Sequence, residues 1–467
     1  MCASVSSPSG SDLKQLALDV VAKAKKAGAT DAEAVVYESE EFGTLVRLGQ
    51  VETLKESGSR AIGLRVFIGQ RTASTSSSEF SSESIERLVS GAVALAKITS
   101  EDPFAGLPES EAFGQLEGDL KLYFDDVNEQ PPAERIEIAR RAEAAAMAYD
   151  TRIQNSGGGD FDTATSHKIM VNSRGFVGEF RKSYCGFSAS PIAQDEHGMQ
   201  RNYWYSNSRT VSKLESPEEI GQEAARRTLK RLGARQVKTQ AAPVVFSPEI
   251  ARSIMGNIFE AANGDAIYRH ASFFADKLGE QIAGENITVV DDGTMVFADD
   301  EKNGGIGGFG TSPFDGEGLL TRRKVIVERG ILKNYVMNTY TARKLGMAST
   351  GNASRGLAGN PGIGAGNFYL EAGTLTPEEI IGDIKNGLYV TETMGFGVNL
   401  VTGDYSQGAS GMWIENGEIA YPVEEITIAG NLKDMYKNIV AIGNDLVFRG
   451  ASAAPTIRVE GMMVAGA

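Results

Sequence analysis

The sequence predicts an α+β protein in two parts: an N-terminal α/β sandwich-like module built on an antiparallel sheet, and a C-terminal, glycine-rich, β-dominated domain. Helical and strand-like patterns alternate over 12–149, and period-two alternation dominates 152–212. Glycine makes up 54 of the 467 residues, about 12% against a norm near 7%. We place the N-terminal domain at 1–235, with a connector at 101–130, and the C-terminal domain at 243–467.

The first elements follow from local patterns. A helix capped by Ser11 or Asp12 is expected to run to Gly28, because apolar residues recur at helical spacing and lysines gather near its end. Strand patterns and a second helix come next, with a hairpin signal at Gly69-Gln70. The expected ranges are 34–38, 44–48, 60–68 and 71–77 for strands and 82–97 for the helix.

The rest of the N-terminal domain is expected to hold two helices and a meander. An alanine-rich helix is predicted over 133–149, followed by antiparallel strands over 152–212. Ser216 and Pro217 have the cap and first-turn signature of a helix that ends near Gly233. We expect a linker at 236–242 and a new apolar strand from 244 onward.

Composition and charge exclude several function classes. The chain carries 61 acidic and 46 basic side chains, a net charge of -15, and a field of this sign repels phosphate backbones and anionic membranes. No apolar run is long enough to span a bilayer. The start lacks the pattern of a secretory signal, and Cys2 and Cys185 cannot form a disulfide framework. We therefore expect a soluble cytoplasmic protein that binds neither nucleic acid nor membrane.

General catalytic and metal-binding motifs are weak. Gly305, Gly307 and Gly310 fit the dinucleotide pattern, but Pro313 follows where a helix should begin, so a flexible loop is expected. The acidic glycine turns near 291, 299, 315 and 404 fit no EF-hand spacing and are typical of turn formers. The histidines are too far apart in sequence for a short metal motif, although His270 lies in an aromatic, basic stretch that could contact a ligand: His167, His197 and His270.

Four segments mix polar side chains with glycines, a composition suited to a peptide cleft or a subunit seam: 311–318, 341–345, 403–409 and 421–432. The turn T-S-P-F-D-G-E-G, the loop G-D-Y-S-Q-G-A and the run E-I-T-I-A-G-N-L resemble the modulator-of-gyrase family, the TldD/TldE peptidases, and specifically its TldE or PmbA branch. The strand A-I-G-L-R-V-F at 61–67 is also similar to the family's first domain.

The resemblance implies a subunit of a cytosolic heterodimeric zinc metallopeptidase that acts on unfolded peptides. In such pairs the TldD-like sibling carries an H-E-x-x-x-H helix and a later cysteine as zinc ligands. The comparable place here is 259–264, where Glu260 matches the general-base position, both histidines are missing, and Cys185 lies far upstream. We therefore expect no metal and no catalytic residue in this chain, with zinc held by the partner subunit.

An extended peptide is expected to add as a strand to an exposed sheet edge in a chamber shared with the partner. The candidate peptide-binding or subunit-interface residues lie in the matching segments: Ser312, Asp315, Asp404, Tyr405 and Ser406. Two alternatives stay open. One is a homodimer that binds peptides or a regulatory partner without hydrolysis, and the other is an independent hydrolase that uses His270 and the acidic loops.

Overall fold

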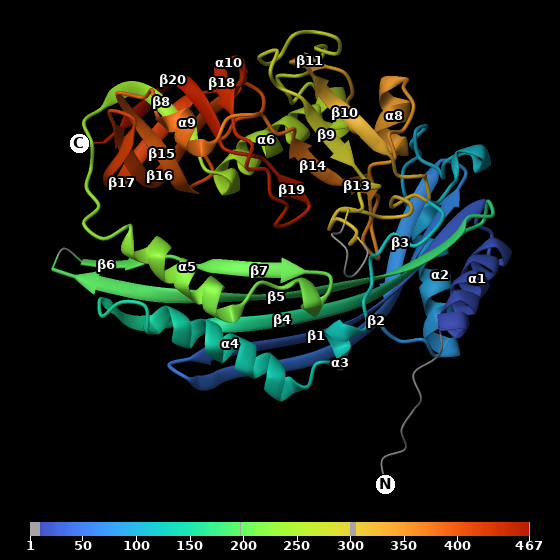
Figure 1. Cartoon of the computed structure of the whole chain (residues 1–467). Coiled ribbons are helices and arrows are strands. Elements are labelled where there is room, and N and C mark those ends of the chain that lie inside the picture. The colour runs from blue at the N-terminus through green and yellow to red at the C-terminus, as the bar shows by residue number, and fades with distance from the viewer. Residues whose placement is uncertain (1–9, 197, 299–304, 467) are drawn as a thin grey trace.

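The computed structural model describes residues 10–196, 198–298 and 305–466, and its N-terminal half is built on one long antiparallel sheet (Figure 1). The strand order is β3-β2-β1-β4-β5-β6, and β7 also pairs with β5. The strands are β1 (Asp31–Arg47), β2 (Gln50–Ile68), β3 (Arg71–Ser77), β4 (Ile153–Asn172), β5 (Val177–Asp195), β6 (Gly198–Arg201) and β7 (Trp204–Ser208).

Helices cover one face of this sheet in two groups. Alternate residues of β1 point to the same face, and Val36 packs under α1 and α2 while Phe42 packs under α4 and α5. The long strands therefore support two separate hydrophobic clusters, one toward each end. The helices are α1 (Gly10–Lys26), α2 (Ser82–Ile98), α3 (Asp126–Glu129), α4 (Pro132–Met147) and α5 (Pro217–Leu229), with short 3-10 turns at Ser110–Ala112 and Val211–Lys213.

The C-terminal half contains a six-stranded sheet in which five strands close into a barrel and β18 pairs with β20 outside the ring. Its strand order is β17-β16-β15-β8-β20-β18, and pairing of β17 with β20 closes the sheet on itself. Trp413 and Tyr436 are among the large side chains buried in this half. The strands are β8 (Gln240–Phe246), β15 (Asn386–Met394), β16 (Asp404–Glu415), β17 (Glu418–Asn431), β18 (Ile439–Ile442) and β20 (Ile457–Ala465).

A second, five-stranded sheet lies beside the barrel, with the order β11-β10-β9-β14-β19. Its strands are β9 (Val289–Asp292), β10 (Arg323–Glu328), β11 (Ile331–Leu332), β14 (Asn367–Leu370) and β19 (Ser452–Ala453). The remaining elements are α6 (Pro248–Ala262), α7 (Gly264–Tyr268), α8 (Thr339–Leu345), α9 (Pro377–Ile381), α10 (Leu432–Lys437) and the small ladder β12 (Ala353–Ser354) with β13 (Gly362–Ile363).

One contact between the two halves lies on the sheet face opposite α1 and α2, where Val35 and Met170 pack with Phe314. Phe176, in the turn between β4 and β5, contacts Phe113 of the connector and Phe314 of the C-terminal half, with ring centroids 5.6 and 5.0 Å apart. On β2, a side chain at Gly63 would lie 1.6 Å from the carbonyl oxygen of Leu357. Glycine is therefore required at position 63 for the 355–363 loop to pack this closely.

The α+β class and the antiparallel sheets predicted from the sequence are confirmed. The strands expected at 34–38 and 44–48 form one continuous strand, because β2 and β4 pair with β1 along its length. The predicted linker at 236–242 is shorter than expected, since β8 begins at Gln240 and Val237 is buried. The division into domains at 235–243 stays a prediction. No helix in the described part of the chain is long and apolar enough to cross a membrane.

Candidate functional site at the seam between the halves

The predicted residues Ser312 and Asp315 lie in the loop that packs against the N-terminal sheet. Asp315 is buried, and its two carboxylate oxygens accept backbone N–H groups of Glu317, Leu319 and Ala353 at 2.9–3.0 Å. Ser312 donates its hydroxyl to the Phe314 carbonyl at 2.8 Å. Both side chains thus hold the loop in shape.

The other three predicted residues lie on barrel strand β16. Asp404 and Ser406 are exposed, whereas Tyr405 is buried in the core. This stretch pairs with β17 on one side and with 397–399 on the other, so its backbone offers no free edge to a peptide. Between the described residues, no hydrogen bond or ion pair joins this group to Ser312 or Asp315.

A cavity of about 440 Å³ lies at the seam between the two halves. The sheet contributes Arg65 and Thr72 to its lining, and the C-terminal half contributes Glu317, Asn338 and the loop at 360–363. Helix α8 is tied to this wall, since the Thr339 N–H donates to Glu317 Oε2 at 2.8 Å. The site is therefore assembled from segments far apart in sequence.

A buried charged network borders this cavity. Arg65 pairs with Glu33 across β1 and β2, and Arg355 of the C-terminal half pairs with the same Glu33 oxygen, Oε1. The three side chains are 0–5% exposed. Among the residues that the structure describes, Glu33 Oε2 and Arg65 Nη2 have no hydrogen-bond partner. The network places two guanidinium groups beside one carboxylate, so Glu33, Arg65 and Arg355 together carry a net positive charge. The nearby Glu317 is not included in this sum.

Burial also changes the proton affinity of nearby groups. Burial and the neighbouring Asp315 carboxylate raise the pKa of Glu317 to about 7. Burial raises the pKa of Asp315, although three backbone N–H groups oppose the change. On β4, burial and the nearby Arg355 lower the pKa of Lys168 to about 8. The seam therefore contains groups that change protonation near neutral pH.

Sequence reasoning missed Glu317, Glu33, Arg65 and Arg355 as site residues. Glu317 belongs to the 311–318 turn that the sequence analysis singled out. Arg65 could have been found as well, because it is a charged residue within the apolar strand predicted at 61–67. Arg355 has no comparable signal, because its partner lies more than 300 residues away in sequence. Contacts between residues this far apart in sequence can be identified only from the three-dimensional structure.

Metal-ligating residues do not gather in the described ranges 10–196, 198–298 and 305–466: no group of three or more His, Cys, Asp or Glu could hold a metal ion. At the end of α6, Glu260 is exposed, and Asn263 uses its side chain to cap α7. His167 is paired with Glu179 at 3.3 Å, and His270 is exposed near Asp276. The donor set therefore does not fit a zinc site.

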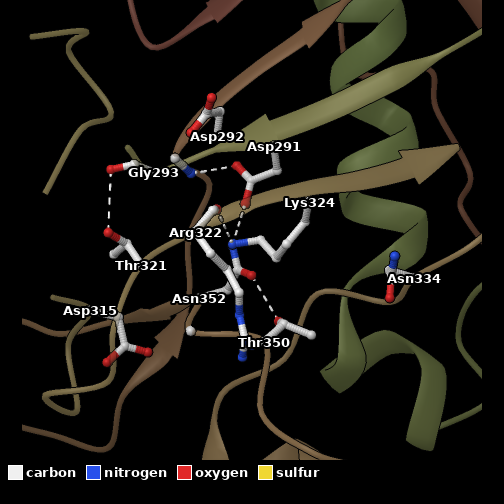
Figure 2. Close-up of polar contacts among 12 residues, drawn as sticks. Asp291, Asp292, Gly293, Asp315, Thr321, Arg322, Lys324, Asn334, Thr350 and Asn352 are labelled. Atoms are coloured by element: carbon white, nitrogen blue, oxygen red, sulfur yellow. Dashed lines mark hydrogen bonds and ion pairs between the residues drawn. The ribbon is translucent and has the colours of Figure 1, made fainter. Parts of the chain in front are cut away.

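The remaining sequence candidates have structural roles or lie outside the described residues. Asp291 contacts Lys324 and Asn352 in a buried network (Figure 2). No helix begins directly after Gly310, and the Gly307 carbonyl accepts a hydrogen bond from Arg209. Buried Cys185 is a free thiol. Cys2, His197 and the acidic pair at 299–300 lie outside the described residues.

The fold places the chain in a class of metallopeptidase-type proteins, as three family models show. They are described as domain 1, the central domain and the C-terminal domain of the PmbA/TldA metallopeptidases, and they match residues 32–96, 125–232 and 239–466. A metalloprotease PmbA from Escherichia coli O157:H7 is 38% identical over 435 residues, which are 93% of this chain and 92% of that protein. The chain belongs to the PmbA/TldD/TldE family.

Solved structures agree with this assignment. A protein from Bacteroides thetaiotaomicron described as a modulator of DNA gyrase superposes with a TM-score of 0.89 at 26% identity, covering 98% of this chain and 99% of the other. TldE from Thermococcus kodakarensis shares the fold, with a TM-score of 0.84 at 22% identity, covering 97% and 100%. The similarity therefore extends over both halves and the seam between them.

Proposed function

We propose that this chain is the non-catalytic subunit of a cytosolic heterodimeric zinc metallopeptidase that acts on unfolded peptides. The observation that carries the proposal is the end of α6, where Glu260 and Asn263 stand in a metallopeptidase-family fold without the donors that zinc needs. Zinc would be supplied by a TldD-like partner subunit. A carboxylate such as Glu260 has no metal-bound water to activate in this chain alone.

The surface beside Asp404 and Ser406 supports a role in pairing. The end of β15 exposes Met394 by 56%, and the loop that follows it exposes Val401 by 57% and Phe396 by 104%. Exposed apolar side chains on one short segment are typical of protein–protein contacts, and the two polar residues would form part of the rim. We propose that this loop, with Asp404 and Ser406, contacts the partner, while Tyr405 supports it from the core.

The peptide is proposed to bind in extended form at the seam between the halves. Strand addition needs a free sheet edge, and β3 is the edge strand that contributes Thr72 to the seam cavity. Ser312 and Asp315 would position the loop that carries Glu317, and would not themselves contact the peptide. Main-chain recognition of this kind would tolerate many peptide sequences.

The test is reconstitution with and without the partner. The purified chain should contain almost no zinc after dialysis, should not cleave unfolded peptides, and should form a chelator-sensitive peptidase when mixed with a TldD-like subunit. Zinc near one atom per chain, or cleavage by the lone chain, would refute the proposal and favour an independent hydrolase. A stable homodimer that captures peptides and never pairs with the sibling would favour the binding-protein alternative.

The pairing surface has its own test. Phe396→Asp should weaken assembly with the partner, because it places a charge in an apolar contact. Its control is Ile98→Asp on α2, where another apolar side chain is 80% exposed. Analytical ultracentrifugation of each variant with the partner should show loss of complex for Phe396→Asp only. Equal assembly of both variants would exclude this loop from the interface.

A further inference from the structure

A second cavity, of about 320 Å³, lies between the end of α5 and the barrel. Figure 1 shows α5 beneath the barrel strands. None of its lining residues lines the seam cavity, so the two sites are separate. Its volume is in the range of small-molecule sites. One wall is apolar, formed by Met412, Ile419 and Val423, and the facing wall is basic, formed by the end of α5 and the residues after it.

A buried hydroxyl on this cavity has no partner. Ser247 lines the cavity and is 3% exposed, and its Oγ makes no hydrogen bond with any residue in 10–196, 198–298 or 305–466. The residue occupies the N-cap of α6, where a serine side chain normally accepts a hydrogen bond from the first turn, yet no such bond forms. An unpaired buried hydroxyl is costly, so a polar ligand at this position would be stabilised.

The strands of the same wall are interrupted around Ser410. Strand β15 changes register against β16 between Val390 and Glu392, and the pairing of β16 with β17 shifts across Ala409 and Gly411. Glu425 has a left-handed backbone, with φ of 53°. The pairing of β16 is therefore irregular on both sides of Ser410, and such irregularities are common beside binding sites.

The charges on the cavity are almost all paired. Arg226 and Arg227 share Glu223, and Arg227 also contacts Glu249 at 3.4 Å. Arg231 pairs with a carboxylate outside the cavity lining, that of Glu392.

Two charged groups on the cavity form no ion pair with a described residue, although the Glu223 carboxylate lies near enough to Lys230 to oppose the lowering of its pKa. Across the described part of the chain, the Lys230 ammonium forms no ion pair, and the Glu424 carboxylate accepts only from the Gln200 amide at 2.8 Å. Burial and the nearby Arg226 and Arg227 lower the pKa of Lys230. The cavity thus offers one unpaired cation and one unpaired carboxylate, which form no ion pair with each other.

We propose that this cavity binds an uncapped amino acid or dipeptide with an apolar side chain. Lys230 would bind the ligand's carboxylate, Glu424 its ammonium, and the Met412, Ile419 and Val423 wall its side chain. A dianionic ligand is disfavoured because the carboxylates that line the cavity would repel it. A purely apolar ligand is disfavoured because it would leave Ser247 and Lys230 without a polar partner. A zwitterion satisfies both charges. The proposal does not depend on zinc or on the partner subunit.

Calorimetric titration of the full chain with leucine, leucyl-leucine, N-acetyl-leucine and leucinamide tests the proposal. The uncapped ligands should bind, and capping either end should weaken binding about tenfold or more, because one charged hydrogen bond is lost. Whichever of leucine and leucyl-leucine binds more tightly identifies the length of the natural ligand. Lack of binding at millimolar concentration, or equal affinity for the capped compounds, would overturn the proposal without any variant being needed.

Two variants assign the ends of the ligand. Lys230→Met should weaken leucine binding and abolish discrimination against leucinamide, while Glu424→Gln should abolish discrimination against N-acetyl-leucine. Lys26→Met is the matched control, because Lys26 is also an exposed lysine at the C-terminal end of a helix. Unchanged binding by both cavity variants would overturn the assignment, and circular dichroism checks that each variant is folded.

Discussion

Asp291 connects the central strand of the five-stranded sheet to the segment that walls the seam cavity, and its truncation to alanine should loosen that connection (Figure 2). Its carboxylate lies 3.1 Å from Lys324 Nζ, accepts from Asn352 Nδ2 at 2.8 Å and accepts from the Gly366 N–H at 2.6 Å. Residues 360–363 of the cavity wall lie between the last two contacts in sequence. The variant therefore tests stability and site geometry together.

The expected magnitude follows from burial. Asp291 is fully buried and the Lys324 side chain is 8% exposed. Removing the carboxylate leaves an ammonium inside the protein, and in the described part of the chain its one other hydrogen-bond partner is the Arg322 carbonyl, at 3.3 Å. Loss of one member of a buried ion pair typically costs about 3–5 kcal/mol, a large part of the roughly 5–15 kcal/mol that stabilises a domain.

Urea unfolding followed by tryptophan fluorescence measures the effect. The chain has two tryptophans, so a Trp204→Phe background leaves Trp413 in the barrel core as the reporter of the C-terminal half. Asp291→Leu combined with Lys324→Met should recover most of the loss, because no charge stays buried. A loss below about 1 kcal/mol for Asp291→Ala, as expected for an exposed pair, would refute the reasoning, as would a double variant no better than the single one.

Three further predictions concern the seam and the core. The raised pKa of Glu317, about 7 against 4.5, means that the folded state binds its proton more tightly than the unfolded chain does; stability should therefore fall as pH rises from 4.5 to 7, and Glu317→Gln should flatten this part of the pH profile of unfolding. Gly63→Ala should cost about 1–3 kcal/mol and increase proteolysis of the facing loop, whereas Gly58→Ala on the same strand, with 3.9 Å of room, should not. Burial raises the pKa of the Cys185 thiol to about 12, so in a Cys2→Ser variant the thiol reagent DTNB should react only after unfolding; fast reaction of the native protein would contradict the burial.

Much of the fold was predictable because its signals are local. The helices at α2, α4 and α5 begin close to the residues predicted from the sequence, and for α5 the signal was the cap and first-turn proline, Ser216 and Pro217. Strand length was not predictable in the same way. The polar residues in the middle of β1 interrupt its apolar pattern, yet pairing with β2 and β4 keeps the whole segment extended.

The candidate site was only partly predictable, because its residues meet through tertiary structure. The 311–318 turn was selected from the sequence as a candidate segment, and the structure places it at the seam. The peptide-binding or interface role was predicted for Asp315, whose oxygens accept backbone N–H groups instead. Glu317, two residues later, is the member of the turn that lines the cavity. A single sequence distinguishes a turn-forming carboxylate from a cavity-lining one poorly, since both favour glycine-rich loops.

Directional hydrogen bonds, as well as apolar contacts, hold the two halves together at the seam. Arg209 is buried and donates to the carbonyl groups of Gly307 and Gly308 at 2.7 and 2.8 Å, and to those of Leu122 and Ser183 on the other side. Apolar contacts such as the Phe176–Phe314 pair are non-directional and would allow one half to rotate on the other. Buried charges are expensive compared with apolar packing of the same shape, and the gain they bring is a fixed geometry. A cavity built from both halves depends on that geometry, because a rotation would separate Arg65 from Glu317 and with them the two walls of the site.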